Sequence, residues 1–516
     1  MADINSTAKE ILFAFEQKYN PYEFRALGFP TWLLVREPMY NFIRGVLSNS
    51  HDYQISAKIG RNLTYVLRRV CKYWRNRELT KEQIDVAFVS NASFRRGTAS
   101  SPCDNIFIDT VLDFLPPDLR YVVIEYPTLT DFDEKLFGSR YDKRTLPLDL
   151  FVPQAWFNLQ LLRFQRDHYR KEIERLFAFP THSVKRIMVP AEDELITFAK
   201  AVLLQETIKY VAATRAFARV FQCWTPKVVV DIAGASRFTY PYWGKTAYYL
   251  EIQHGVITEH HPGYIYPMCA RESLKDFFDK RYLALYGKLY RDILISQSTW
   301  AKERLLITGN PRYSKLVLLD RRLFNKHLKN PLDQKILLFT SQPSGFVQNT
   351  LREFLNEMMK GLPNDYLVVI KLHPRESRHH NPYRRLEKQY KNVRVIAESP
   401  DLANLLYHSY LHISIASTII QEAIYFGTPN VIIASAHSTE TLDALVEQGA
   451  AIVVHNASEL LELLYEWELR PESVAKMKNA QAKVKTLLFG EDSGDPASSI
   501  ANLIKIICEL STQRQE

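Results

Sequence analysis

Small polar residues follow an apolar run in the second half of the chain. Residues 411–416 read Leu-His-Ile-Ser-Ile-Ala, and Ser417, Thr418 and a helix-like segment come directly after them. The segment breaks at Gly427-Thr-Pro429, and a second apolar run follows. This pattern predicts a strand, a tight turn, a helix and a second strand. The helix N-terminus could bind an anion through its N–H groups and dipole. Glu422 lies about one turn into the helix, where its carboxylate could accept hydrogen bonds from ribose hydroxyls.

A second stretch, upstream of the first, carries cationic side chains. Residues 366–371 read Tyr-Leu-Val-Val-Ile-Lys, which is typical of a buried strand, and Leu-His373-Pro374-Arg375 follows. Open α/β sheets bind their ligands beyond the carboxyl ends of the strands. We therefore expect Lys371, His373 and Arg375 to meet an anionic ligand at that edge.

Together the two stretches resemble the donor half of GT-B glycosyltransferases. More narrowly, they resemble bacterial enzymes of capsule, lipopolysaccharide and teichoic-acid synthesis: polysialyltransferases, capsule Kdo transferases, CDP-glycerol transferases and the related UDP-GlcNAc 2-epimerases. The resemblance covers about residues 225–450 and rests on His373-Pro374, Ser417-Thr418, Gln421-Glu422-Ala, Gly427 and Pro429. It implies that His373-Pro374 contacts the nucleotide, that the hydroxyl-rich turn holds the phosphates and that Glu422 holds the ribose. The donor-binding residues expected are Lys371, His373, Pro374, Arg375, Ser414, Ser417, Thr418, Gln421, Glu422, Arg312 and Gln342.

The resemblance favours one class of donor without settling it. The Ser-Ser turn of the polysialyltransferases is Ser417-Thr418 here, which keeps both hydroxyls. The Asp-Tyr pair that precedes this turn in CDP-glycerol transferases is replaced by residues 413–416, Ile-Ser-Ile-Ala. We therefore favour a CMP-activated acidic sugar over CDP-glycerol, and UDP-sugars remain open.

Glycosyl transfer needs a base that deprotonates the acceptor hydroxyl, and a histidine or a buried carboxylate suits neutral pH. His254 ends a first-domain strand in the sequence Gln-His-Gly, resembles the His-Gly histidine of the CDP-glycerol transferases, and is expected to face His373 across a cleft. The alternative is a histidine that only caps the sheet edge. Glu125, Glu259 and Glu251 are weaker candidates.

The polar loop after residues 84–90 contains Arg95 and Arg96. In a GT-B architecture this loop would face the cleft, so the two arginines are candidate acceptor contacts. A plain surface loop is the alternative.

Neither a metal nor a cofactor is expected. We find no Asp-x-Asp in the sugar-binding position, and the spacing of His254, His260 and His261 fits no zinc pattern. Leaving-group stabilisation would then be electrostatic, with the nucleotide sugar as substrate. GxGxxG and Walker A motifs are also lacking, which argues against a dehydrogenase or a P-loop NTPase.

Composition limits the class of protein. The chain has 516 residues, 46% of them hydrophobic and 24% charged, which predicts two or three soluble domains. The start of the sequence has no signal-peptide pattern, no apolar run is long enough to span a membrane, and the five scattered cysteines suggest a reducing compartment. We therefore expect a cytoplasmic protein.

A net charge of +9 favours an anionic binding partner. No nucleic-acid-binding motif accompanies it, so an acidic substrate or an anionic membrane surface at the inner face is favoured. The basic amphipathic segment 57–77 could lie on such a surface, or it could be a solvated basic face over a core stripe.

The order of apolar runs predicts an α/β protein of the GT-B class, with two Rossmann-like domains facing a cleft. Runs at 84–90, 121–125, 226–231 and 249–253 predict first-domain strands, a helix is expected near 241–249, and 292–296 and 306–312 are expected to close the domain. The domains expected are a helical region 1–80 within the first domain, a first Rossmann-like domain 81–320 with a helical insertion 153–222, a linker 321–334, a donor domain 335–490, and a last helix 491–516 that crosses back.

Two other functions share these features. A nucleotide-sugar epimerase or hydrolase of the UDP-GlcNAc 2-epimerase type would use the same donor half. A non-catalytic GT-B-like binding protein would keep the fold alone. The helical insertion and the basic N-terminal region favour a transferase that extends a surface glycan or a lipid-linked acceptor.

Overall fold

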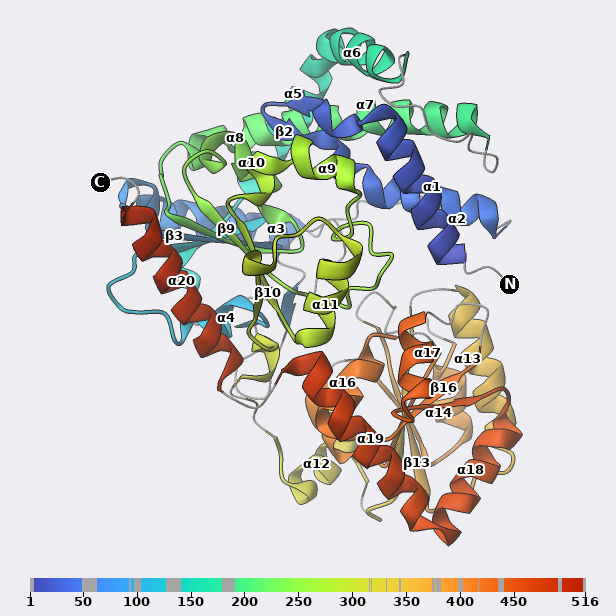
Figure 1. Ribbon diagram of the computed structural model, residues 1–516. Helices are drawn as coiled ribbons and strands as arrows, with labels where there is room; N and C mark the ends of the chain where they lie inside the picture. The colour runs from blue at the N-terminus through green and yellow to red at the C-terminus, as the bar shows by residue number, and fades with distance from the viewer. Residues whose placement is uncertain are drawn as a thin grey trace. The chain divides into compact units, whose positions relative to one another are not determined.

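The computed structural model describes most of the chain and divides it into two compact units (Figure 1). Unit 1 contains Met1–Arg96, Asp104–Arg312 and Gly494–Glu516, and unit 2 contains Tyr313–Ser493. The residues described are 4–48, 63–91, 94–96, 104–126, 141–178, 191–314, 316, 318–330, 332–342, 345–373, 376, 382–397, 402–415, 417–434, 440–490 and 494–513.

Unit 2 is built on a six-stranded parallel sheet. Its strands lie in the order β14-β13-β12-β15-β16-β17, so the strand order reverses between β12 and β15. This is the doubly wound Rossmann order, in which ligands bind where the order reverses. The strands are β12 (Lys335–Thr340), β13 (Tyr366–Lys371), β14 (Val393–Ile396), β15 (Leu411–Ser414), β16 (Asn430–Ile433) and β17 (Ile452–Val454).

Both faces of the unit 2 sheet are covered by apolar side chains. Along β12, Leu337 and Phe339 belong to one core cluster, whereas Ile336 and Leu338 belong to another. Successive side chains of a strand point to opposite faces, so the near-continuous apolar strands are those of a sheet buried on both sides. The helices are α12 (Arg321–Leu328), α13 (Gly345–Met358), α14 (Arg384–Gln389), α15 (Leu402–His408), α16 (Ile419–Phe426), α17 (Glu440–Glu447), α18 (Ala457–Leu469) and α19 (Pro471–Phe489).

Unit 1 repeats this plan with a seven-stranded parallel sheet. Its order is β11-β10-β9-β8-β3-β6-β7, which reverses between β3 and β8. The strands are β3 (Val86–Asn91), β6 (Tyr121–Tyr126), β7 (Thr145–Pro147), β8 (Val228–Ile232), β9 (Tyr248–Ile252), β10 (Arg281–Leu285) and β11 (Leu305–Ile307). Two short antiparallel pairs stand apart, β1 (Arg25–Ala26) with β2 (Phe29–Pro30) and β4 (Arg95–Arg96) with β5 (Asp104–Asn105).

Helices surround the unit 1 sheet, and α7 covers part of it with Phe217, Val220 and Phe221 (Figure 1). The last helix, α20, belongs to unit 1, where the GT-B resemblance places a crossing helix. The helices are α1 (Ile4–Tyr19), α2 (Arg36–Leu47), α3 (Leu63–Asn76), α4 (Ile108–Leu112), α5 (Val152–Leu161), α6 (Arg166–Ala178), α7 (Glu192–Phe221), α8 (Tyr240–Trp243), α9 (Met268–Ser273), α10 (Lys275–Phe278), α11 (Lys288–Gln297) and α20 (Pro496–Gln513).

The two sheets confirm the prediction of an α/β chain with two Rossmann-like units, a helical N-terminal region and a helical insertion. Three local expectations need correction. Residues 292–296 lie in helix α11, and β10 before it is the strand; Tyr290 and Leu294, both buried, show the helical spacing. Residues 321–328 form helix α12 of unit 2 where a linker was expected. The helix near 241–249 is only α8, because β9 begins at Tyr248.

Among the helices of the described ranges, none is both long enough and apolar enough to cross a membrane.

Candidate active site

In unit 2, the turn between β15 and α16 lies directly beside the point where the strand order reverses. Ser417 Oγ accepts a hydrogen bond from the backbone N–H of Ile419 at 3.2 Å and so caps the start of α16. The helix ends at Gly427, whose φ of 69° is in the left-handed region that glycine adopts without strain. The strand, turn, helix and second strand predicted for 411–434 are therefore present.

A buried histidine holds the neighbouring strands in place. His412 on β15 contacts Thr340 Oγ1 through Nε2 at 2.9 Å and Asn430 Oδ1 through Nδ1 at 2.7 Å. The Asn430 oxygen can only accept, so Nδ1 carries the proton and Nε2 accepts from Thr340. Burial lowers the pKa of His412 to about 4, so the ring is neutral. His412 thus joins β12, β15 and β16 through side-chain hydrogen bonds.

The loop after β13 is fixed by Glu376. Its carboxylate accepts hydrogen bonds from the backbone N–H of His373 at 2.6 Å, from Gln348 Nε2 at 2.7 Å and from Ser341 Oγ. Lys371 Nζ donates to the carbonyl of Ala397 at 2.5 Å. Glu376 therefore ties the predicted nucleotide-contacting His373 to the end of β12.

The other donor-binding candidates of unit 2 divide into three groups. Ser414 ends β15, is fully buried, and its Oγ has no hydrogen-bond partner among the described residues. Gln421 is buried in the first turn of α16, whereas Glu422 and Gln342 are partly buried and Thr418 is exposed. Pro374 and Arg375 lie outside the described residues.

Arg312 is the last residue of unit 1 before the chain enters unit 2 at Tyr313. Its backbone N–H donates to Asn310 Oδ1 at 3.1 Å, and its guanidinium lies 6.0 Å from the centre of the Phe107 ring.

In unit 1, His254 follows β9 in a turn that Gln253 fixes. Gln253 Nε2 donates to the carbonyl of Gly255 at 2.7 Å, and Gln253 Oε1 accepts from the backbone N–H of Tyr286 at 2.8 Å. The His254 ring is partly buried and meets the Phe94 ring edge-on at 6.1 Å. Burial lowers the pKa of His254, so the imidazole is neutral at pH 7 and can accept a proton.

Two further polar side chains connect His254 with the interior. Tyr264 Oη lies 3.5 Å from His254 Nδ1 and donates to Glu251 Oε1 at 2.7 Å. Glu251 Oε2 accepts from Arg281 Nη1 at 3.3 Å, and the same nitrogen lies 3.7 Å from Asp231. Burial and the charge of Asp231 raise the pKa of Glu251 to about 7, although Arg281 and Tyr264 oppose this.

The loop that carries Tyr264 is held by the N-terminal helices. Arg36 donates to the carbonyls of Ile265, at 2.8 Å, and Pro262, and its guanidinium lies 4.5 Å from the centre of the Tyr266 ring. Glu16 of α1 accepts from Arg36 Nε at 2.7 Å. The N-terminal region, predicted only as helical, therefore supports the loop after His254.

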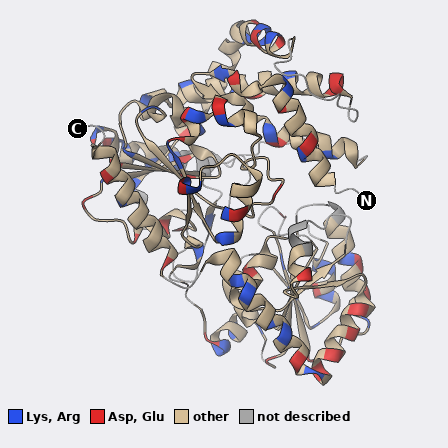
Figure 2. Cartoon of the chain, viewed as in Figure 1, with Lys and Arg blue, Asp and Glu red and all other residues tan. Residues whose placement is uncertain are grey.

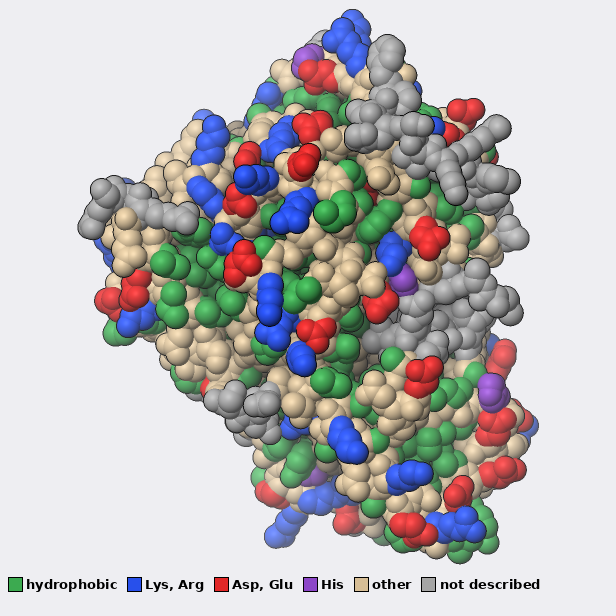
Figure 3. Space-filling model, viewed as in Figure 1, with side chains coloured by type: hydrophobic (Ala, Val, Ile, Leu, Met, Phe, Trp, Pro, Cys, Tyr) green, Lys and Arg blue, Asp and Glu red, His purple; other side chains and the backbone are tan. Residues whose placement is uncertain are grey.

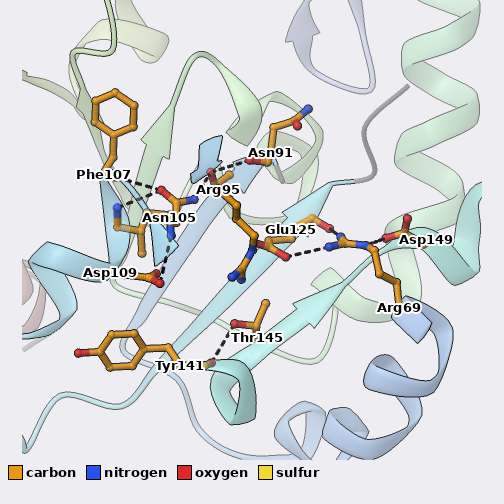
Figure 4. A network of polar contacts seen from close by, with 12 residues as sticks. Arg69, Asn91, Arg95, Asn105, Phe107, Asp109, Glu125, Tyr141, Thr145 and Asp149 are labelled. Carbon is orange, nitrogen blue, oxygen red and sulfur yellow. Dashed lines mark hydrogen bonds and ion pairs between the residues drawn. The ribbon is translucent and has the colours of Figure 1, made fainter. Parts of the chain in front are cut away.

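Glu125, a weaker candidate for the base, lies in a buried network (Figure 4). Its carboxylate pairs with Arg95 Nε at 2.5 Å and Arg69 Nη1 at 3.0 Å, and Arg69 Nε pairs with Asp149 at 2.5 Å. Burial alone would raise the pKa of Glu125, but the two guanidiniums outweigh it and lower the pKa to about 2. Such a carboxylate is a poor base at pH 7.

This network also affects Arg95, which with Arg96 was a candidate acceptor contact. Arg95 is only 3% exposed and is paired with Glu125, so an acceptor could reach it only by breaking that pair. Arg96 lies in β4, and its side chain is outside the described residues. Glu259 is exposed.

Arg69 of α3 points into unit 1, which favours the interpretation of 57–77 as a helix that covers a core. Residues 57–62 lie outside the described residues.

Charges of both signs are interspersed on the side of the molecule shown in Figures 2 and 3, without one basic field among the described residues in view. Within the described ranges, no three His, Cys, Asp or Glu side chains are grouped so that they could hold a metal ion. Metal-independent transfer stays a prediction.

The sequence reasoning gave no role to Tyr264, Arg281 or Glu376. The aromatic loop around Tyr264 and the stretch containing Glu376 are visible in the sequence. Their partners Glu251 and Ser341 lie on other elements, and no local pattern indicates such pairings.

Comparison with known proteins gives matches by structure only: no family model and no curated protein matches the chain. A UDP-GlcNAc 2-epimerase from Neisseria meningitidis bound to UDP-GlcNAc is 16% identical, with 83% of this chain and 99% of that chain covered and a TM-score of 0.45. The wall teichoic acid polymerase TagF is 14% identical, with 87% and 100% covered and a TM-score of 0.46. The glycotransferase of kitacinnamycin is 13% identical, with 83% and 100% covered and a TM-score of 0.46. The epimerases and the teichoic-acid enzymes are among the groups that the sequence motifs resemble.

Proposed function

We propose that the protein is a glycosyltransferase that moves a sugar from a nucleotide-activated donor to a surface polysaccharide or a lipid-linked acceptor. The observation that carries the proposal is the position of the turn at Ser417-Thr418. It follows β15 at the reversal of the strand order, next to the polar end of β12, where doubly wound sheets bind nucleotides. Glu422 lies in the first turn of α16. The resemblance implies that its carboxylate accepts hydrogen bonds from the ribose hydroxyls.

The chemistry follows from the charges at this edge. The start of α16 and the cations Lys371 and, when protonated, His373 would stabilise the negative charge that develops on the departing nucleotide. In unit 1, the neutral His254 would take the proton of the acceptor hydroxyl. We favour a CMP-activated acidic sugar as donor, because the hydroxyl turn resembles that of the polysialyltransferases.

The acceptor is proposed to be a glycan or a glycolipid, and the net charge of +9 supports contact with an acidic substrate or an anionic membrane surface. The transfer is proposed to need no metal and to take place in the cytoplasm.

A thermal-shift panel of CMP, CDP, UDP, GDP and ADP tests the donor half. A nucleotide present at a hundred times its Kd stabilises the native state by about 2.7 kcal/mol. For a unit of this size that corresponds to a rise in Tm of roughly 5–10 °C. We expect one nucleotide to raise the Tm of the wild type, and His373→Ala to reduce that rise.

His327→Ala is the matched control, because His327 is exposed on α12. A selective response to CMP supports the favoured donor class, whereas a selective response to UDP favours the epimerase alternative, which would change the sugar without an acceptor. If none of the five nucleotides changes the Tm, the transferase proposal is refuted.

A further inference from the structure

His254, Tyr264 and Glu251 form a chain of polar contacts from the edge of the unit 1 sheet into its interior. Tyr264 Oη is 3.5 Å from His254 Nδ1 and 2.7 Å from Glu251 Oε1. The other Glu251 oxygen, Oε2, accepts from Arg281. A tyrosine hydroxyl has one proton to donate, so when that proton goes to Glu251, the Tyr264 oxygen can only accept from His254.

From this geometry we infer that Tyr264 and Glu251 are positioning residues, which hold His254 in the tautomer that carries its proton on Nδ1. Nε2 then bears the lone pair that receives the acceptor proton. The inference rests on the proposed function for the role of His254 as the base, but the tautomer itself does not depend on any ligand.

The step that this tautomer permits is balanced. The acceptor O–H bond breaks and its proton passes to His254 Nε2, which becomes the second N–H of an imidazolium. The acceptor oxygen bonds to the anomeric carbon, while the bond from that carbon to the phosphate oxygen breaks and its electrons leave with the nucleotide. With the other tautomer, Nε2 would carry a proton and could not accept one.

Tyr264, the middle residue of these polar contacts, is fixed by further hydrogen bonds. The carbonyl of Tyr264 accepts from Ser298 Oγ at 2.9 Å and from Trp300 Nε1 at 3.0 Å. On the same loop, His261 Nδ1 accepts from the backbone N–H of Gly263 at 3.1 Å, so His261 already has its own partner. Tyr264 is therefore held between Glu251 and His254 by contacts that do not involve its hydroxyl.

The protonation of Glu251 decides the direction in which hydrogen bonds are donated between Glu251, Tyr264 and His254. Because Arg281 donates to Oε2, a proton on Glu251 would reside on Oε1 and point at Tyr264. The tyrosine would then donate to His254 Nδ1, and His254 would carry its proton on Nε2. The other titratable or charged groups around this carboxyl are Asp231 on β8, Arg281 on β10, Tyr266 on the loop and His254 itself.

The direction of hydrogen-bond donation between these three side chains should therefore change with pH. The pKa of Glu251 is raised to about 7, so its proton leaves as the pH passes through that value. Above this pH the Nδ1–H tautomer, which can act as a base, dominates; below it the Nε2–H tautomer dominates.

Nitrogen NMR of the full-length protein, uniformly labelled with ¹⁵N-histidine, tests the inference without a donor or an acceptor. His254→Ala identifies the resonances of this ring. In the wild type we expect the Nδ1–H tautomer at pH 8 and a change towards Nε2–H as the pH falls through about 7. A wild type with Nε2–H at pH 8 would overturn the inference.

Two variants break the polar contacts between Glu251, Tyr264 and His254 at different points. Tyr264→Phe lacks the acceptor oxygen, and Glu251→Gln presents an amide N–H towards Tyr264 while its carbonyl faces Arg281, so it mimics the protonated carboxyl. Both should give the Nε2–H tautomer at pH 8, whereas the control Tyr282→Phe on β10 should behave as the wild type. If either test variant keeps Nδ1–H, the positioning role is refuted.

The failure of this inference can be told apart from the failure of the proposed function. The nucleotide panel tests the donor site of unit 2, and the NMR experiment uses no nucleotide. With a donor that the panel selects, Tyr264→Phe should lower kcat with KM unchanged and should remove the step in activity near pH 7. A purely structural role would change neither the tautomer nor the pH profile.

Discussion

Replacing Glu125 by glutamine would test whether the buried network of Arg69, Arg95 and Asp149 is structural. Glu125 is fully buried and forms ion pairs with both arginines. Its pKa is about 2, compared with 4.5 for the unperturbed side chain. This difference corresponds to roughly 3 kcal/mol of stability at neutral pH. The cost of breaking a buried ion pair is similar, about 3–5 kcal/mol.

The sign of the pH dependence follows from the lowered pKa. The unfolded state takes up a proton near pH 4.5, while the native carboxyl stays ionised down to about pH 2. The unfolded state therefore binds more protons within this window, and the wild type loses stability as the pH falls through it. About 1.4 kcal/mol should be lost by pH 3.5. Glu125→Gln should be about 3 kcal/mol less stable at pH 7 and should lack this contribution to the pH dependence.

Urea unfolding followed by tryptophan fluorescence is a suitable assay, because every tryptophan except Trp467 lies in unit 1. Glu174→Gln on α6 is the control, since Glu174 is exposed and should leave the unfolding midpoint unchanged. If Glu125→Gln unfolds at the same urea concentration as the wild type at pH 7, the network does not stabilise unit 1. A variant that is fully stable but inactive would return Glu125 to the candidates for the base.

Three further changes test unit 2. The pKa of His412 is about 4, compared with 6.5 for the unperturbed side chain, so between these pH values only the unfolded ring gains a proton and unit 2 should lose stability as the pH falls. Hydrogen exchange of the β12 and β15 amides would show this loss. His412→Asn should make the stability of unit 2 less dependent on pH in this range. Gly427→Ala should cost about 1 kcal/mol in urea unfolding, because alanine is strained at a φ of 69° although no atom lies within 4 Å of the added methyl, and Gly427→Asn should cost less. Glu376→Ala should reduce the nucleotide-induced rise in Tm, because the His373 N–H would lose its acceptor; an unchanged rise would remove Glu376 from the site.

Much of the fold follows from local patterns in the sequence. The apolar runs at 84–90 and 366–371 correspond to β3 and β13, because a strand buried on both faces is apolar at nearly every position. The same criterion misplaced 292–296, a short apolar run that also fits one face of a helix. The boundary between the units was expected later than Arg312 because the charges of 321–334 suggest a linker, yet Phe324 and Leu328 of α12 are buried in unit 2.

The candidate site was predictable only in part, for a physical reason. The carboxyl ends of parallel strands lie at one edge of a sheet, so Ser417 and His373 could be assigned to the same edge from the sequence. The contact between Tyr264 and Glu251 depends on how one loop folds back over β9, and the pairing of Glu125 depends on α3. A single polar pairing between two elements, unlike the packing of an apolar face, produces no periodic pattern in the sequence.

The pairing of Arg95 also restricts where an acceptor can bind in unit 1. An anionic acceptor group that took Arg95 from Glu125 would leave that carboxylate buried without one of its two described arginine partners, and the other, Arg69, also holds Asp149. Breaking a buried pair costs about 3–5 kcal/mol, more than the roughly 1.5–3 kcal/mol that a hydrogen bond to a charged group returns. Acceptor binding through Arg95 is therefore unfavourable. An acceptor that meets His254 should accordingly bind cations other than Arg95, and Arg95→Lys should impair the stability of unit 1 before it impairs acceptor affinity.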